Sequence, residues 1–411
     1  MRTVGAGAGF AGDRIDPAVA LATSGLCDAV VLECLAERTL VAALRARRAD
    51  SDAGADPRLR RRLTPLLGPA RRSGSRIISN LGAANPAAAA RAIVALAREL
   101  GLSGLRVAAV VGDDVLPLAG EIAWTEKIEG TLLGAHAYLG ADALAPAIEA
   151  GADVIVTGRT ADSALFAAEI VPILDGRETA LAGALTVGHL LECGGQVSGG
   201  NFKGPDGESL SAAALASLGY PLATVRPDGS AELFLLEGAP GRLDRLTATL
   251  QLLYEVHDPA RYITPDLILD FTGIRIEETG RNRVRVSGAA AQGRPEALKV
   301  SGFVERPGMI ADVEIGFAGT GAEARAACRR CASASARRPP GRGCQDRSGR
   351  DRFDSRRAQR RQCGACRMPR PRLCPMPRCG GGAGDRGRGL CSHALRPRGR
   401  GRAQERASPA P

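Results

Sequence analysis

Up to about residue 170, short apolar runs alternate with amphipathic stretches, and this alternation constrains the fold of the chain more than any other feature. Uninterrupted apolar runs of about four to eight residues are typical of strands that are buried on both faces. The runs that we predict to be strands cover residues 2–4, 28–34, 76–80, 105–111 and 152–158. The pattern favours a mostly parallel sheet with helices on both faces, a Rossmann-like α/β fold. A TIM barrel is the alternative, although the strand count falls short of eight.

The stretches between these runs carry helix signals. Residues 37–49 have the apolar spacing of a helix, and residues 85–101 begin with Asn85 as N-cap and Pro86 at the first helical position. Asp16 and Pro17 give an equally strong helix start, with Asp16 as the N-cap.

From about residue 231 the pattern changes to short β-rich segments that are separated by turn signals. We therefore expect two ordered domains. Residues 1–230 form an α/β domain with a Gly-rich N-terminal loop, and residues 231–327 form a smaller α+β domain.

Composition changes sharply at residue 328. Residues 328–411 hold eight of the eleven cysteines and are rich in Arg, Gly and Pro, with few side chains to bury, so we predict a disordered tail. The whole chain has three Lys against 52 Arg, which indicates GC-rich coding, and the tail reads as the product of a shifted frame. A genuine basic tail that binds nucleic acid is one alternative. A zinc module built from Cys363, Cys366, Cys374 and Cys379 is another.

Charge and hydropathy limit the partners of the body of the chain. Residues 329–411 carry a net charge of +18 and residues 1–328 carry −7, so we expect no specific nucleic-acid binding by the body. No uncharged apolar run reaches about 18 residues, so we expect no membrane span. Charged residues interrupt the start before any secretory core, and the body has only three cysteines, Cys27, Cys34 and Cys193. These features predict a soluble, cytoplasmic protein.

The segment "GAGAGFAGDRIDP" contains the spacing G-x-G-x-x-G between Gly7 and Gly12, which is typical of a dinucleotide-binding turn. In that turn the helix begins inside the glycine motif, whereas here Asp13 and Arg14 separate Gly12 from the helix start. Glu33 does lie where a ribose-binding acid is expected. We favour a loop shaped around another ligand, with NAD(P) binding and a purely structural turn as the alternatives.

Polar or glycine-rich sequence follows every predicted strand of the parallel sheet. Because ligands of such sheets bind beyond the carboxyl ends of the strands, we expect these residues to form one polar crevice. The predicted catalytic residues are Asp13, Glu33 and Asp162. The predicted ligand-binding residues are Gly7, Gly9, Gly12, Arg14, Arg38, Asn80, Asn85, Asp113, Asp114 and Arg159.

Each of these side chains also has a structural interpretation. Arg14 and Arg159 suit a carboxylate or phosphate, but each has a neighbouring Asp with which it can pair. Asp113, Asp114 and Asp162 could bind Mg²⁺ or simply cap helices, and we predict no metal. The sequence assigns no role to His136 or His189.

Several stretches together resemble one family. They include "GAGAGFAGDRIDPAVALA", "VVLECLAERTL", "NLGAANPAAAAR", "GADVIVTGRTAD", "GHLLECGGQVSGGNF" and "LLYEVHDPARYITPDLILDFTGIRIEETG". In this order they resemble the acyclic terpene utilisation (AtuA) family from Gly5 to about Ala324. The resemblance implies a cytoplasmic bacterial protein of the breakdown of branched acyclic terpenoids such as citronellol and geraniol, whose intermediates travel as CoA thioesters. It implies no particular reaction.

We therefore expect a protein that acts on a small acyl or CoA-linked anionic substrate, with an unidentified cofactor and either a homo-oligomer or an acyl-CoA enzyme as partner. A non-catalytic binding subunit and an NAD(P)-dependent enzyme are the alternatives. Titratable groups with shifted pKa values at the strand ends would favour an enzyme, and amides and arginines alone would favour a binding protein.

Overall fold

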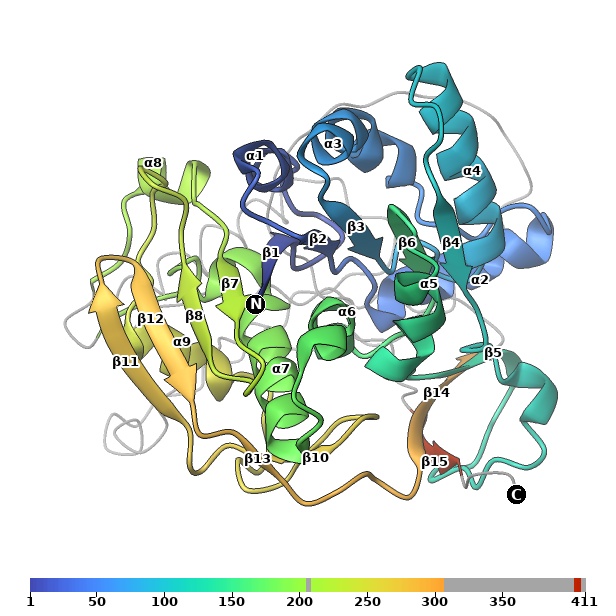
Figure 1. The fold of residues 1–411 in the computed structure, drawn as a ribbon. Helices are drawn as coiled ribbons and strands as arrows, with labels where there is room; N and C mark the ends of the chain where they lie inside the picture. Colours follow the sequence, from blue (N-terminus) through green and yellow to red (C-terminus); the bar gives the residue numbers. More distant parts are fainter. Residues whose placement is uncertain (205–207, 307–402, 408–411) are drawn as a thin grey trace, which may run out of the picture. The chain divides into compact units, whose positions relative to one another are not determined.

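The computed structural model describes residues 1–204, 208–306 and 403–407. The chain divides into one unit of residues 1–304 and 403–411 and a second unit of residues 305–402, and the fold below belongs to the first. Its centre is a nine-stranded sheet with the order β11-β12-β8-β7-β1-β2-β3-β6-β4 (Figure 1). The parallel strands are β1 (Arg2–Ala8), β2 (Ala29–Leu32), β3 (Arg76–Ser79), β6 (Val154–Thr157) and β4 (Val107–Val110).

Both faces of the parallel strands are buried. Along β2, Val30 and Leu32 pack with one apolar cluster, whereas Ala29 and Val31 pack with another on the opposite face. One face is covered by α1 (Asp16–Ser24), α3 (Leu59–Ser73) and α4 (Pro86–Glu99), and the other by α6 (Asp162–Ile170) and α7 (Glu178–Leu191), as Figure 1 shows. The predicted α/β fold is confirmed, and the open sheet excludes the TIM barrel.

The five predicted strands and three predicted helices are present, with shifted ends. The helix predicted at residues 37–49 is α2 (Glu37–Ala49). In α1 the N-cap is Ile15, one residue before the predicted Asp16. The first strand is longer than predicted, since β1 continues to Ala8 and takes in half of the expected glycine loop.

Strands from the second half of the chain extend the same sheet with antiparallel pairing. They are β7 (Leu222–Val225), β8 (Ala231–Phe234), β12 (Arg283–Ser287) and β11 (Arg275–Gly280). The helix α9 (Arg245–Leu252) connects β8 toward β11, and short helices α5 (Ala145–Glu149) and α8 (Ala212–Ala216) lie in connections. Sheet pairing thus joins much of the predicted smaller domain to the parallel strands, while its boundary at residue 230 stays a prediction.

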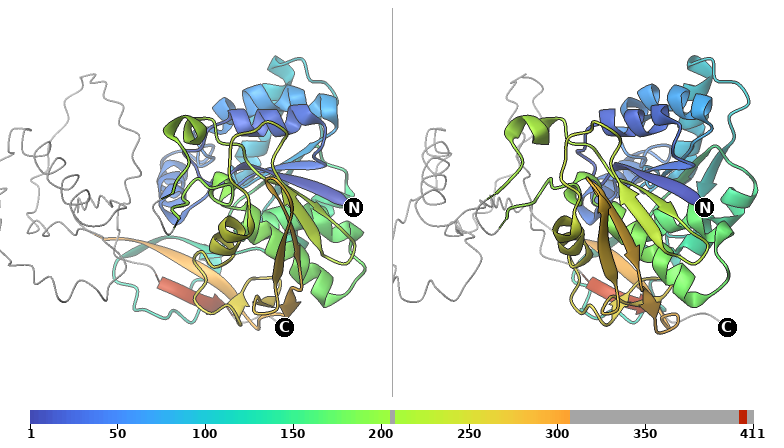
Figure 2. Two further views of the ribbon diagram at one scale, coloured as in Figure 1. Left: turned by 90° about the vertical axis from the view of Figure 1, so that its left-hand side faces the viewer. Right: turned by 60° about the vertical axis from the view of Figure 1, so that its left-hand side comes forward.

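Two smaller sheets complete the described fold. One holds β13 (Ala290–Ala291), β10 (Ile268–Asp270) and β9 (Tyr262–Ile263), and the other holds β15 (Ala403–Ala407), β14 (Leu298–Glu305) and β5 (Thr131–Ala137). Figure 2 shows β15 in red beside the orange β14. Apart from β15, the predicted tail of residues 328–411 and its zinc module lie outside the described residues.

Candidate functional site

Polar side chains from three parallel strands meet at the carboxyl end of the sheet. Glu33 follows β2, Asn80 follows β3 and Arg159 follows β6, and all three are buried. Asn80 donates from Nδ2 to Glu33 Oε1 over 2.9 Å, and the Leu35 N–H donates to the same oxygen over 2.9 Å. We call Glu33, Asn80, Arg159 and Asp162 the strand-end cluster. It brings together four residues that the sequence proposed as catalytic or ligand-binding.

Arg159 holds the cluster together. Its Nη1 donates to the Leu35 carbonyl over 2.6 Å, its Nη2 donates to the Thr160 carbonyl over 2.8 Å, and the same Nη2 pairs with Asp162 Oδ1. The guanidinium carbon lies 4.5 Å from the centre of the Tyr138 ring, a cation–π distance. The positive charge therefore lies within the protein between Glu33 and Asp162.

The carboxyl groups of the cluster keep their protons more readily than ordinary acids. Burial raises the pKa of Glu33 well above its usual value, and the Asp162 charge adds to this shift, while Arg159 opposes it. Burial also raises the pKa of Asp162, with Arg159 again opposing the shift, although 39% of its side chain is reached by solvent. Within the described residues both hydrogen bonds of the Glu33 carboxyl go to Oε1. The other oxygen is left to carry a proton that it can give to a ligand.

Asp13 is a third buried carboxyl group, in the loop after β1. Its Oδ2 accepts from the Gly9 N–H over 2.7 Å and its Oδ1 accepts from the Tyr220 hydroxyl over 2.6 Å. Burial raises the pKa of Asp13, and both hydrogen bonds and the charge of Arg62 oppose the rise. The Gly9 N–H, which a dinucleotide phosphate would need, is thus bound to a protein carboxyl.

Two glycines of the N-terminal motif are explained by packing. A Cβ on Gly7 would lie 2.7 Å from Leu32 Cδ2, because α1 and β2 pack closely against β1. A Cβ on Gly9 would lie 2.7 Å from the Cα of Cys193, so this glycine lets the loop pass over the backbone that follows α7. Gly12 is exposed and faces the Phe10 ring. The packing at Gly7 and Gly9 requires no ligand.

Both predicted anion-binding arginines are paired inside the protein. Arg14 Nη2 donates to the Leu218 carbonyl over 2.8 Å, Nη1 donates to the Ala216 carbonyl, and Nε lies 3.2 Å from Asp16 Oδ1. Arg159 pairs with Asp162. Each arginine therefore has the neighbouring aspartate that the structural interpretation describes, and an anion-binding role for either stays a prediction.

Three other predicted residues have positions outside the strand-end cluster. Asn85 is buried and caps α4, with Oδ1 accepting from the Ala88 N–H over 3.1 Å. Asp114 is exposed and pairs with Arg47 at 3.1 Å. Arg38 is exposed in the first turn of α2. Helix capping thus accounts for Asn85, and ligand-binding roles for the other two stay predictions.

A buried Asp–His pair at the same edge of the sheet escaped the sequence analysis in part. Asp113 was predicted, but its partner His136 lies on β5, which the sequence did not reveal. His136 Nδ1 and Asp113 Oδ2 are 2.8 Å apart, and the same oxygen accepts from the Arg159 N–H over 2.8 Å. A Cβ on Gly158 would lie 2.6 Å from Asp113 Oδ1, so the glycine makes room for this carboxylate.

The other ring nitrogen of His136 has no hydrogen-bond partner among the described residues. His136 is 1% exposed, and its Nε2 is a buried atom without a donor or acceptor nearby. Leaving such a group unsatisfied costs about 1–3 kcal/mol. Because Asp113 accepts at Oδ2, the neutral ring carries its proton on Nδ1 and presents a lone pair at Nε2.

A second unpredicted cluster lies at the end of α7. His189 Nδ1 is 3.1 Å from Glu192 Oε1, and its Nε2 is 3.1 Å from the Leu252 carbonyl oxygen. Burial raises the pKa of Glu192, with Asp162 contributing and His189 opposing. Burial alone would lower the pKa of His189, but Glu192 outweighs it and raises the pKa. The influence of Asp162 on Glu192 indicates that this cluster adjoins the strand-end cluster.

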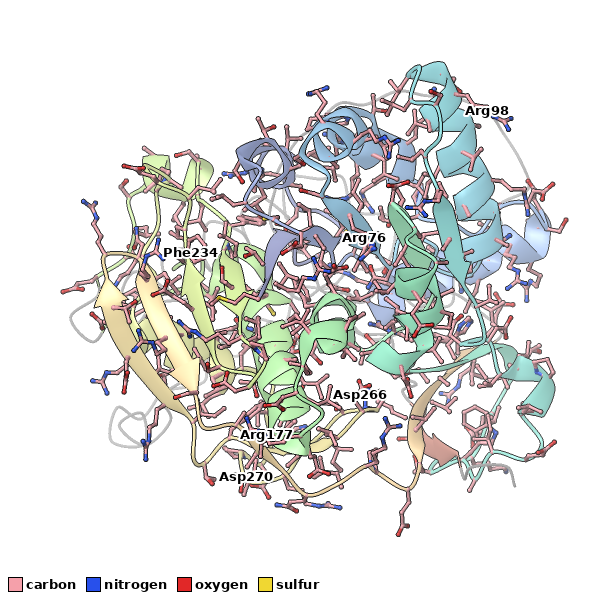
Figure 3. All side chains as sticks on the ribbon, viewed as in Figure 1. Arg76, Arg98, Arg177, Phe234, Asp266 and Asp270 are labelled. Carbon is pink, nitrogen blue, oxygen red and sulfur yellow. The ribbon has the colours of Figure 1, made fainter. Side chains whose placement is uncertain are left out.

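Other buried groups show no comparable arrangement. Burial raises the pKa of Cys27 to about 12 and also raises the pKa values of Cys34 and Cys193, so none of the three is an activated thiolate. Within the described residues, no group of three His, Cys, Asp or Glu side chains is placed to hold a metal ion. The buried ion pair of Arg76 with Glu169 of α6 lies at the amino end of β3, away from the carboxyl-end residues (Figure 3).

The fold and the cluster together define the class: an α/β protein with helices on both faces of a parallel sheet and buried, proton-holding carboxyl groups beyond its strand ends. Residues 2–337 match the family described as "Acyclic terpene utilisation family protein AtuA". The chain belongs to the acyclic terpene utilisation family. No curated protein and no solved structure matches the chain. None of the helices in the described ranges is long and apolar enough to cross a bilayer.

Proposed function

We propose that this protein is an enzyme of acyclic terpenoid breakdown that transfers a proton to or from the acyl group of a branched, CoA-linked intermediate, with Glu33 as the acid–base residue. Family membership supports the role in acyclic terpene utilisation. The observation that carries the catalytic part is the Glu33 carboxyl, which is buried at a strand end, has a raised pKa and bonds through one oxygen.

The chemistry of the cluster favours a neutral acyl group over a free carboxylate. Glu33, Asp162 and Asp13 are acids, and Arg159 already pairs with Asp162. A bare carboxylate placed among them would be repelled by any ionised neighbour. A protonated Glu33 can instead donate to the carbonyl oxygen of a thioester, so the negative charge of the substrate belongs on its CoA part.

Several carboxyl groups with raised pKa values favour an enzyme over a non-catalytic binding subunit, because proton transfer near neutral pH needs such groups. For a dinucleotide enzyme no observation on the described residues speaks: Gly9 donates to Asp13, and α1 begins only at Asp16. Homo-oligomer formation or a partner acyl-CoA enzyme is compatible with this proposal but carries no part of it.

The first test is a thermal-shift comparison of citronellyl-CoA, citronellic acid, CoA and NAD with the full chain. We expect stabilisation by the thioester that exceeds that by CoA or by the free acid, and none by NAD, because ligands raise the melting temperature in proportion to their affinity. Glu33→Gln keeps the shape and the acceptor oxygen and should still bind the thioester. Equal stabilisation by CoA and its thioester, or stabilisation by NAD alone, would contradict the proposal.

A further inference from the structure

The unpartnered nitrogen of the Asp113–His136 pair points to a binding function of its own. Asp113 Oδ2 receives hydrogen bonds from His136 Nδ1 and from the Arg159 N–H, and both side chains of the pair are buried. Gly158 is the residue that makes room for the carboxylate, so the turn after β6 is shaped around this pair. Three separate segments thus fix one imidazole with its Nε2 lone pair unused.

The surroundings of the imidazole are apolar. The ring of Phe303 meets the ring of His136 edge to face, with the centroids 6.1 Å apart. Phe303 belongs to a small buried cluster with Leu35, Leu40, Ala83 and Ala84, which come from the segments after β2 and β3. An acceptor at the edge of an apolar cluster suits a ligand that is mostly hydrocarbon and carries one hydrogen-bond donor.

The pair also adjoins the strand-end cluster through Arg159. The N–H of Arg159 binds Asp113, while its guanidinium binds the Leu35 carbonyl next to Glu33. A single ligand that lies along this edge of the sheet would meet the Glu33 carboxyl with one polar group and His136 with another.

We infer that Asp113 and His136 form a hydroxyl-binding site, in which Nε2 of His136 accepts a hydrogen bond from the hydroxyl group of a branched acyclic ligand. Asp113 keeps the proton on Nδ1, so that Nε2 stays an acceptor. The inference rests on the proposed function only for the branched acyclic nature of the ligand. It narrows the substrate class of the proposed enzyme to branched acyclic compounds with a hydroxyl group.

The ligand test compares citronellol with citronellyl methyl ether, which has the same carbon chain without the donor. We expect the full chain to bind the alcohol at least about tenfold more tightly than the ether, the effect of roughly one hydrogen bond. Equal affinities would overturn the inference.

Two substitutions of His136 separate its two nitrogens. The amide nitrogen of Asn lies near the position of Nδ1, so His136→Asn keeps a donor for Asp113 and removes Nε2; it should lose the preference for the alcohol. The amide oxygen of Gln reaches the position of Nε2, so His136→Gln should retain part of that preference. If His136→Asn prefers the alcohol as strongly as the unmodified chain does, the inference is wrong.

A spectroscopic measurement covers the case in which the variants do not fold. In the unmodified chain labelled with ¹⁵N-histidine, citronellol should shift the Nε2 resonance of one buried histidine, and the ether should not; an unmoved resonance would contradict the site. Glu33→Gln should keep the alcohol preference. A failure of Glu33 catalysis and a failure of hydroxyl binding therefore give different results.

Discussion

At the scale of the residue, Glu33 is a carboxyl group in a place that disfavours its ionised form. Asn80 and the Leu35 N–H bond to one of its oxygens, yet burial still outweighs these hydrogen bonds and Arg159 in setting its pKa. Such a group stabilises the fold less once it is ionised. The same property suits it for proton transfer, so stability and function are opposed at this position.

Glu33→Gln tests this opposition through the pH dependence of stability. Because the pKa of Glu33 is raised in the folded state, its favourable contribution is fully present below the unfolded-state pKa of about 4.3 and is lost as pH rises through the folded-state pKa. Gln is neutral throughout. The free energy of unfolding of the variant relative to the unmodified chain should therefore increase from about pH 5 to about pH 8 in urea titrations. A difference that is constant with pH would show that the Glu33 pKa is not raised.

Gly9→Ala tests the packing account of the N-terminal motif. The new Cβ would meet the backbone of Cys193 and Gly194, which cannot move as a side chain can. We expect a loss of about 1–3 kcal/mol in the free energy of unfolding. The control is Gly120→Ala, where a Cβ meets nothing within 4 Å, with an expected change within about 0.5 kcal/mol. Equal effects of the two substitutions would contradict the account.

The sequence predicted Glu33, Asn80, Arg159 and Asp162 because residues after neighbouring parallel strands must lie at one edge of a sheet. It did not pair Asp113 with His136, because β5 begins and ends without turn or alternation signals and pairs with a strand that is distant in the sequence. It also assigned Gly7 and Gly9 to a ligand, since a glycine required by packing looks the same in one sequence as a glycine required by a phosphate.

At the scale of the element, helices with local start and stop signals were predictable and the others were not. Asn85, Pro86 and Gly101 bound α4 as expected. The helix α3 contains Pro65 and Pro69, which argue against a helix locally, yet its apolar face packs under the sheet. Tertiary packing therefore decided α3, and no local signal could have revealed it.

Asn85→Ala measures the contribution of one cap. The substitution removes the hydrogen bond to the Ala88 N–H and two bonds from Nδ2 to the carbonyls of Ser51 and Ala53, each 2.9 Å long. We expect a loss of about 1–2 kcal/mol in the free energy of unfolding. Ser211→Ala, which removes the cap of the short, exposed α8, should cost less. A larger effect at Ser211 than at Asn85 would contradict the assignment.

At the scale of the whole molecule, one sheet carries both the parallel strands that position the site and the antiparallel strands that follow in sequence. Residues after β1, β2, β3, β4 and β6 all reach the carboxyl edge, and α7 ends nearby with Glu192. This arrangement explains why residues separated by more than a hundred positions influence one another's pKa values, as Glu33 and Asp162 do.

The central claim is that Glu33 transfers protons to the acyl group of a branched thioester. Incubation of the full chain with citronellyl-CoA in D₂O, followed by mass spectrometry of the acyl chain, measures this transfer directly. We predict that the unmodified chain incorporates deuterium, that Glu33→Gln is slowed at least about a hundredfold while it still binds the thioester, and that Glu277→Gln, at an exposed position on β11, is unaffected. No incorporation by the unmodified chain, or equal rates for the unmodified chain and Glu33→Gln, would contradict the account.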